Sequence, residues 1–332
     1  MDRRTFLKTA GATTVIGSLA GCGGNSGGNG NGNGNGNGNG NGNGNGNGNE
    51  DGTPYVDGMI KFLMSPSEPQ DRLRAQYTPI KERLNNYVDA VDTVEMQYAN
   101  NYAATLTALG AGTGDIAETG PFAAALGVEA GNAEVLLQRW GYGAWTYSST
   151  IVTQEDSDIE TLADLEGKTI GFADTLSASG SLYPLGMLKE AGLSVPNEPG
   201  SKAGADFEPR WSDHFAAVEA LKSGTVDAAG VGFFAATNDQ REYKEGVREV
   251  KREKGIPRAP IMVSPQLSED EKMKVQKAFT EAPDSMYLGA DGEEGTDDDL
   301  WFSKVRPATV DTYQPVIEKA QTLGYGAEVF EN

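Results

Sequence analysis

The chain has 332 residues, of which 38% are hydrophobic, and it carries a formal net charge of −21 at pH 7. This length allows two domains of ordinary size, each with a core of its own. The acidic balance argues against nucleic acid as a partner, because binding it needs a positive surface. The chain has 48 acidic and 27 basic residues, which indicates adaptation to molar salt, where repulsion between surface carboxylates is screened.

The first 21 residues have the pattern of an export signal. The twin arginines Arg3 and Arg4 precede an apolar run at residues 10–19 that is too short to span a bilayer. Residues 19–22 read L-A-G-C, which resembles the lipobox of exported lipoproteins, and Cys22 is the only cysteine. We therefore expect a lipid on Cys22 that anchors the protein to the outer face of the cytoplasmic membrane. The alternative is an incidental free thiol.

Residues 22–56 form the next segment, and from 23 to 50 they alternate almost entirely between Gly and Asn. Such a composition has too few apolar groups to bury, so it predicts a flexible, disordered tether. The tether would hold a folded body close to the membrane.

Strand-like and helix-like segments alternate through the first part of the folded chain. The helix at residues 68–88 is indicated by Leu73, Tyr77, Ile80 and Leu84, whose spacings of three and four place them on one face. This alternation predicts a parallel sheet covered by helices. The other expected elements here are strands at 58–64, 91–96, 114–117, 135–137 and 150–152, and helices at 102–109 and 122–129.

A second α/β unit is expected from about residue 164, and the chain returns to the first unit near residue 260. We predict lobe 1 from residues 57–152 and 257–332, and lobe 2 from residues 153–256, with two crossings that make a hinge. An aromatic loop at 140–147 is expected to pack at the hinge, or alternatively to stack on a ligand. The remaining expected elements are helices at 185–191, 213–221, 269–282 and 310–323, and strands at 168–173, 226–231, 247–250 and 260–263.

Residues 174–184 form a Ser-rich turn between the strand at 168–173 and the helix at 185–191. A strand that turns into a helix through Ser177, Ser179 and Gly180 directs N–H groups and hydroxyls to one spot, at the positive end of the helix dipole. Such a turn suits an oxyanion. The alternative is an ordinary serine N-cap on a surface helix.

Several short segments, taken in order, resemble the PhnD-like periplasmic binding proteins of phosphonate and phosphate ABC transporters. The resemblance extends from about residue 59 to residue 268. Its pieces are S-P-S at 65–67, Y-T-P at 77–79, Tyr102, D-I-A at 115–117, G-P at 120–121, D-S-D-I at 156–159, L-A-D-L-E-G-K at 162–168, S-A-S-G at 177–180, Pro184, and His214 ahead of V-D-A at 226–228.

The resemblance implies a two-lobe Venus-flytrap fold, the type II periplasmic binding protein, in which each lobe is a mixed, mostly parallel sheet flanked by helices. It also implies that the lobes close on a small phosphorus oxyanion and deliver it to an ABC permease. The ligand-binding residues that it implies are Ser65, Tyr102, Thr119, Ser177, Ala178, Ser179, Gly180 and His214. Hydroxyl and N–H donors suffice for micromolar affinity, without an arginine or lysine in the pocket.

Two positions depart from the aminophosphonate-binding members of this family. Where those members hold the ligand's amine with carboxylates, this chain has Phe234 and Ala259. Burying an ammonium group without a carboxylate is costly, so we expect a ligand without an amine, such as phosphate, phosphite or a small alkylphosphonate.

Other functions remain as alternatives at this point. A lipid-anchored sensor would need the same closing body, and a serine hydrolase would use Ser177 or Ser179 with His214. The acidic loop at 291–299 either binds calcium or is simply solvated. We expect a monomer that is not an enzyme and holds neither a cofactor nor a metal.

Overall fold

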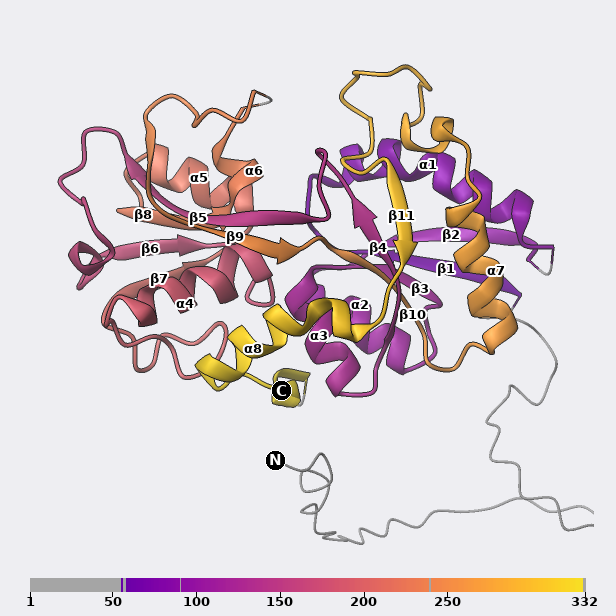
Figure 1. Cartoon of the computed structure of the whole chain (residues 1–332), viewed down its shortest axis with the longest axis horizontal. Coiled ribbons are helices and arrows are strands. Elements are labelled where there is room, and N and C mark those ends of the chain that lie inside the picture. The colour runs from indigo at the N-terminus through magenta and orange to yellow at the C-terminus, as the bar shows by residue number, and fades with distance from the viewer. Residues whose placement is uncertain (1–54, 56–57, 90, 239, 331–332) are drawn as a thin grey trace, which may run out of the picture. The chain divides into compact units, whose positions relative to one another are not determined.

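The computed structural model describes residues 55, 58–89, 91–238 and 240–330. The predicted signal peptide, Cys22 and nearly all of the predicted tether lie outside the described residues. Two sheets lie side by side in the described part of the chain (Figure 1). Each sheet is the centre of one lobe.

The first sheet has six strands in the order β11-β4-β10-β3-β1-β2. β1 pairs in parallel with β2 and β3, whereas β10 runs antiparallel to β3 and β4, and β11 runs antiparallel to β4. The strands are β1 (Met59–Met64), β2 (Thr93–Tyr98), β3 (Ile116–Glu118), β4 (Glu134–Trp140), β10 (Pro260–Val263) and β11 (Lys304–Pro307).

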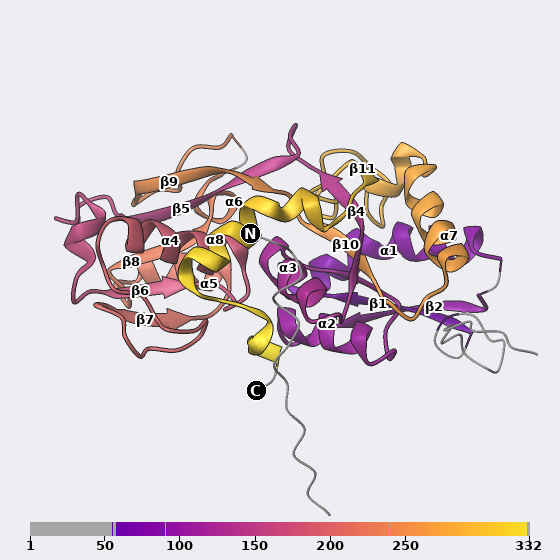
Figure 2. The same ribbon diagram turned by 60° about the horizontal axis from the view of Figure 1, so that its bottom comes forward.

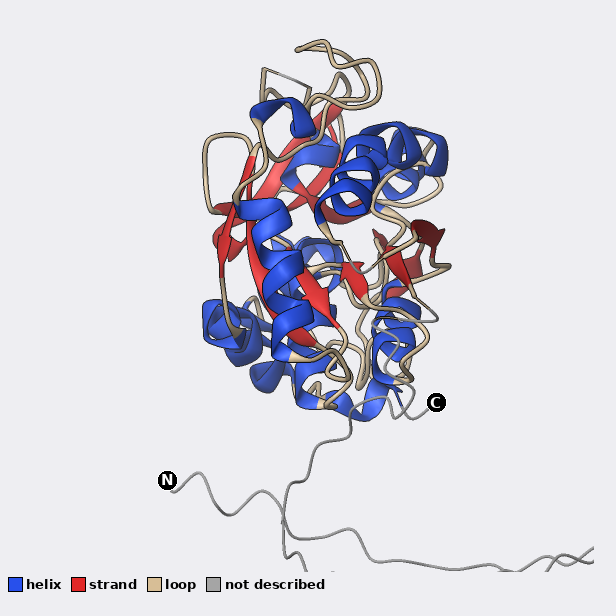
Figure 3. Ribbon diagram, turned by 90° about the vertical axis from the view of Figure 1, so that its right-hand side faces the viewer, coloured by secondary structure: helices blue, strands red, loops and turns tan. Residues whose placement is uncertain are grey.

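Helices cover both faces of this sheet, as Figure 3 shows. Successive side chains of a strand point to opposite faces. In β1, Phe62 therefore packs on the side of α1 and α7, and Leu63 on the side of α2 and α3. Helix α1 confirms the predicted amphipathic face, because Leu73 and Ile80 are both buried there. The helices are α1 (Gln70–Tyr87), α2 (Tyr102–Gly110), α3 (Pro121–Glu129) and α7 (Glu269–Thr280).

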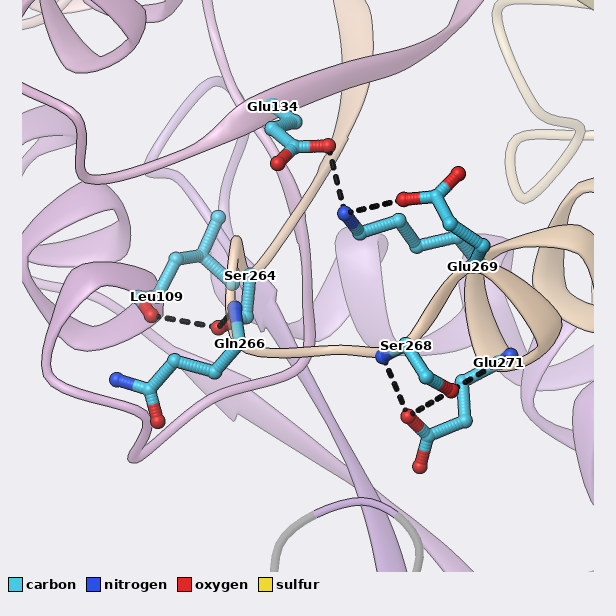
Figure 4. Close-up of polar contacts among 8 residues, drawn as sticks. Leu109, Glu134, Ser264, Gln266, Ser268, Glu269 and Glu271 are labelled. Atoms are coloured by element: carbon cyan, nitrogen blue, oxygen red, sulfur yellow. Dashed lines mark hydrogen bonds and ion pairs between the residues drawn. The ribbon is translucent and has the colours of Figure 1, made fainter. Parts of the chain in front are cut away.

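Polar contacts fix the returning segment after β10 to the first lobe (Figure 4). The Ser264 hydroxyl donates to the Leu109 carbonyl at 2.8 Å. Ser268 then starts α7 with a capping box, since its hydroxyl accepts from the Glu271 N–H and its own N–H donates to the Glu271 carboxylate. The Lys272 ammonium group ties α7 to β4 through Glu134 at 2.8 Å.

The second sheet has five strands in the order β7-β6-β8-β5-β9. β6 pairs in parallel with β7 and β8, and β5 runs antiparallel to both β8 and β9. The strands are β5 (Thr146–Gln154), β6 (Thr169–Phe172), β7 (Glu208–Trp211), β8 (Ala228–Gly232) and β9 (Val247–Pro257), and the helices are α4 (Tyr183–Glu190), α5 (His214–Lys222) and α6 (Phe233–Ala236).

The chain crosses between the sheets twice, from β4 to β5 and from β9 to β10. The boundary that we predicted between residues 152 and 153 falls inside β5, whose full length pairs in the second sheet. Two apolar strands that follow one another are usually neighbours in one sheet, and here they are not. The first crossing is the turn around Gly141 and Ala144 instead.

Helix α8 (Gln314–Leu323) packs on both lobes, although we predicted it in lobe 1. Figures 1 and 2 show it alongside α3 of the first lobe and α4 of the second. Its Val316 and Ala320 join a core cluster that contains residues of both lobes. The Lys319 ammonium group pairs with Glu190 at 2.8 Å and with Glu253 at 3.0 Å, both in the second lobe.

Short turns of helix and an acidic loop complete the described chain. In the acidic loop, Asp298 accepts from the N–H groups of Ala290 and Asp291, and Asp299 accepts from that of Gly295. Across the described ranges no cluster of histidine, cysteine or acidic side chains is arranged to hold a metal ion, so calcium binding gains no support. The 3-10 turns are η1 (Leu162–Leu165), η3 (Asp284–Tyr287), η4 (Val310–Tyr313) and η5 (Ala327–Phe330).

None of the helices in the described part of the chain combines the length and the apolar character needed to cross a membrane.

Candidate ligand-binding site

A cavity of about 80 Å³ lies between the two lobes. At roughly 10–15 Å³ of such volume for each water-sized atom, it holds a ligand of about five to eight non-hydrogen atoms. Of the eight residues that we predicted to bind ligand, all but Gly180 line this cavity: Ser65, Tyr102, Thr119, Ser177, Ala178, Ser179 and His214. The sequence therefore located the cavity, and the contacts below show what each side chain can do there.

The Ser-rich turn is a single π-helical turn, η2 (Ala178–Leu182), which leads directly into α4. Ser177 caps it, since its hydroxyl oxygen accepts from the Gly180 N–H at 3.1 Å. Position 180 requires glycine because a Cβ there would lie 2.3 Å from the Ala173 Cβ and 2.6 Å from the His214 Cε1. Gly180 thus shapes the turn and lets His214 approach it, without lining the cavity itself.

His214 is the first residue of α5, and its two ring nitrogens have different partners. Nδ1 accepts from the Gly232 N–H at 3.0 Å, so the ring proton lies on Nε2. Nε2 lies 3.1 Å from the Ser177 hydroxyl oxygen and donates to it. Burial lowers the pKa of His214 to about 4, although Asp213 opposes the shift, so the ring is neutral near pH 7.

This relay orients the Ser177 hydroxyl. Its oxygen already accepts from His214 and from Gly180, so its own proton is left to point into the cavity. The arrangement is also the reverse of a serine hydrolase, in which the imidazole accepts the serine proton and its other nitrogen donates to a carboxylate. His214 is therefore built to position Ser177 and not to serve as its general base.

Tyr102 and Thr119 face the cavity from the first lobe. Tyr102 begins α2, and Asn101 caps that helix by accepting from the Ala104 N–H at 2.8 Å. Burial raises the pKa of Tyr102 well above its ordinary value, so its hydroxyl keeps its proton and can donate. The Thr119 side chain is 1% exposed, and its hydroxyl has no partner anywhere in the described chain. A polar ligand would satisfy it.

Ser65 lines the cavity but is not a free donor. Its N–H and its hydroxyl both donate to Glu118, at 2.8 and 2.9 Å. The other Glu118 oxygen lies 3.0 Å from Arg139, whose side chain is 1% exposed and which also donates to the Tyr77 hydroxyl. Ser65 therefore belongs to the ion-pair network of Glu118 and Arg139 in the first-lobe wall. Its contact with the ligand stays a prediction, and the hydrogen bonds to Glu118 disfavour it.

The sequence missed several residues that line the cavity. Arg139 and Arg258 both do so, and thus a pocket without arginine is the wrong expectation. Arg258 lies in the crossing from β9 to β10, and its only signal in the sequence was its neighbour Ala259, which was predicted to lie beside the ligand. Phe234 and Ala259 also line the cavity, as their predicted place beside the ligand requires.

The aromatic loop divides between the two roles considered for it. Tyr142 and Tyr147 line the cavity. By contrast, Trp140 stacks under the Lys304 ammonium group at 4.1 Å, and a similar stack pairs Trp145 with Arg306 at 4.2 Å. Half of the loop therefore forms the wall of the cavity, and half packs on β11.

Comparison with known proteins agrees with this geometry. The family described as the periplasmic substrate-binding protein of phosphonate ABC transporters matches residues 62–313, which is most of the chain. The chain therefore belongs to this family of phosphonate-binding proteins. The family consists of transport proteins that bind a substrate, not of enzymes.

A curated relative of this chain is the phosphate-import protein PhnD of Mycolicibacterium smegmatis. The two are 32% identical over 169 residues, which make up 49% of this chain and 51% of the relative. The chain thus spans about half the length of the curated relative that it matches.

Two of the solved structures that are similar to this chain share its fold. One is a binding protein component of an ABC phosphonate transporter from Pseudomonas aeruginosa, 22% identical, with a TM-score of 0.65 over 80% of this chain and 86% of that chain. The other is PhnD1 from Prochlorococcus marinus in complex with methylphosphonate, 19% identical, with a TM-score of 0.62 over 81% and 99%. The predicted type II periplasmic binding protein fold is confirmed.

Proposed function

We propose that this protein captures a small phosphorus oxyanion without an amine in the cavity between its lobes and delivers it to an ABC permease outside the cytoplasm. The observation that carries the proposal is the Ser177 hydroxyl, whose proton the His214 relay leaves free to point into the cavity between the lobes. Two further hydroxyls belong to residues that line the same cavity. That of Thr119 has no partner in the described chain, and that of Tyr102 keeps its proton.

The energetics of this donor set are sufficient. A hydrogen bond to a charged oxygen contributes about 1.5–3 kcal/mol, and micromolar affinity needs about 8 kcal/mol. The curated relative is named for phosphate import, and the Prochlorococcus relative was solved with methylphosphonate, which supports a ligand of this class. Phe234 and Ala259 put no carboxylate at these two positions of the wall, and the carboxylates that do line the cavity, Glu68 and Glu118, are paired with Arg72 and Arg139, which supports a ligand that lacks an amine.

A thermal-shift screen of the full chain in molar salt tests the proposal. Phosphate, phosphite and methylphosphonate are compared with sulfate and glucose at equal concentrations. A ligand at about 100 times its Kd stabilises the folded state by about 2.7 kcal/mol, which is a readily measured rise in Tm. A protein that responds to glucose, or to none of the phosphorus oxyanions, contradicts the proposal.

The proposed membrane anchor is the lipid on Cys22, supported by the L-A-G-C segment at 19–22 and by the twin arginines that precede it. Cys22→Ser is expected to move the exported protein from the membrane fraction to the medium, as measured by fractionation and intact mass. Equal membrane association of both forms would rule the anchor out.

Light scattering in molar salt checks the proposed monomer.

Adaptation to high salt is proposed from the net charge of −21. Transfer of the protein from molar salt to dilute buffer is expected to unfold it, as followed by circular dichroism. A protein that keeps its fold in dilute buffer is not adapted in this way.

A further inference from the structure

Arg258 is a buried cation without a carboxylate partner. The residue is 5% exposed, and its Nε donates to the Ala144 carbonyl at 3.0 Å. Among the residues that the structure describes, no carboxylate lies within ion-pair distance of its guanidinium. Burial lowers the pKa of Arg258 to about 10, which still leaves it charged near pH 7. A charge in this position is costly until something pairs with it.

Aromatic rings surround the guanidinium group. Its central carbon lies 5.3 Å from the ring centre of Tyr142, and 5.7 Å from those of Tyr147 and Trp301. Ring faces attract a cation only weakly in comparison with a carboxylate. Because Arg258 itself is 5% exposed, an anion that reaches it meets a strong interaction.

The other charged groups that line the cavity are already paired. Arg139 is paired with Glu118 at 3.0 Å. Glu68 lies 3.1 Å from the Nε of Arg72 and forms no ion pair with Arg258. Of the charged side chains that line the cavity, Arg258 alone is left unpaired within the described chain. The cavity thus has a net positive end.

Tyr147 connects this arginine to the Ser-rich turn. Its ring faces Arg258, and its hydroxyl is hydrogen-bonded by Ser179, which partly opposes the rise in its pKa caused by burial. Tyr147 therefore lies between the Arg258 guanidinium and Ser179 and contacts both. We call Tyr102, Thr119, Ser177 and Ser179 the hydroxyl end of the cavity, and Tyr142, Arg258 and Trp301 the arginine end.

We propose that Arg258 binds a second anionic group of the ligand, so that the site takes phosphonates whose carbon substituent ends in a carboxylate. This rests on the proposed function, because the phosphonate group occupies the hydroxyl end. A guanidinium group binds a carboxylate through two parallel hydrogen bonds, which adds both affinity and orientation. Phosphonoformate and phosphonoacetate have about as many non-hydrogen atoms as the cavity holds.

Calorimetric titration of the full chain at one fixed salt concentration tests the proposal. Phosphonoacetate is compared with methylphosphonate and with 2-aminoethylphosphonate, which carries an ammonium group in place of the carboxylate. We expect phosphonoacetate to bind roughly tenfold to a hundredfold more tightly than methylphosphonate, and the aminophosphonate to bind most weakly. Arg258→Gln is expected to remove most of the preference for phosphonoacetate, and Arg258→Lys to keep part of it.

Arg306→Gln is the matched control. It removes the same charge from an exposed residue of β11 that does not line the cavity, and the preference is expected to remain. The Tm of Arg258→Gln without ligand shows whether the variant is folded, and it is expected to equal or exceed that of the parent because an unpaired charge has been removed.

If the parent protein binds phosphonoacetate no more tightly than methylphosphonate, the proposal is overturned, whether or not the variant folds. In that case the proposed function still stands, because methylphosphonate binds. If no phosphorus oxyanion binds, it is the proposed function that fails.

Discussion

The first-lobe wall and the second-lobe wall of the cavity both present hydroxyl groups, but different interactions hold them. In the first lobe, the buried pair of Glu118 and Arg139 fixes the segment that carries Thr119. In the second lobe, a neutral relay from Gly232 through His214 orients Ser177. One wall therefore depends on charge that is shielded from salt, and the other depends on the protonation state of one ring.

Breaking the ion pair should have the largest effect. Glu118→Gln leaves the Arg139 charge buried and unpaired, so we expect the free energy of unfolding to fall by about 3–5 kcal/mol. Denaturant unfolding in molar salt measures the loss. Glu134→Gln removes a half-exposed partner of Lys272 and should cost less than about 1 kcal/mol. Equal losses in the two variants would show that the buried pair is not special.

Acid should weaken the second wall next. The folded-state pKa of His214, about 4, lies below its ordinary value of 6.5. Between these values the unfolded state binds more protons, so stability is present above pH 6.5 and is lost as the pH falls toward 4. The loss from this group is about 3 kcal/mol. Thermal unfolding of the parent and of His214→Gln across this range isolates the contribution of His214, because the carboxylates titrate in both proteins. Parallel pH profiles would contradict the assignment.

Removing the oriented hydroxyl should weaken ligand binding. Ser177→Ala deletes a donor to a charged oxygen, and we expect affinity for a phosphorus oxyanion to fall roughly tenfold to a hundredfold. Calorimetry with methylphosphonate measures it. Ser181→Ala is the control, because that hydroxyl lies in the same turn, has no partner in the described chain and does not line the cavity. A similar loss in both variants would mean that the turn itself had been disturbed.

Thr119→Val should have the smallest effect. It replaces an unpartnered hydroxyl with a methyl group of nearly the same size, so affinity should fall about threefold to tenfold. The unliganded protein should be as stable as its parent or slightly more so, because no hydrogen bond is lost. A clear loss of stability, measured by Tm, would show that this hydroxyl has a protein partner.

Local patterns in the sequence predicted the parts of this molecule that local interactions decide. The apolar face of α1 and the Ser-rich turn at η2 were confirmed, because spacing and turn chemistry act over a few residues. The predicted lobe boundary inside β5 was wrong. Two apolar strands joined by a short turn do not show in their sequences which strands each of them pairs with.

The roles within the site depended on distant pairs. His214 was expected to bind the ligand and lines the cavity, but its Nε2 proton points to Ser177, because the N–H of Gly232, eighteen residues further along, occupies the other ring nitrogen. Arg258 is functional in our proposal because of a partner that it lacks within the described chain, and no motif can record a missing partner. The sequence could therefore name the donors but not the direction in which each hydrogen bond runs.

Helix α8 has a consequence for how the chain is made. Val316, Ala320 and Leu323 complete a core cluster that includes Leu182 and Leu185 of the second lobe. The second lobe thus lacks part of its apolar core until residues 314–323 have been made, even though its own sheet ends at β9. We expect a chain that stops before residue 314 to remain sensitive to protease in both lobes.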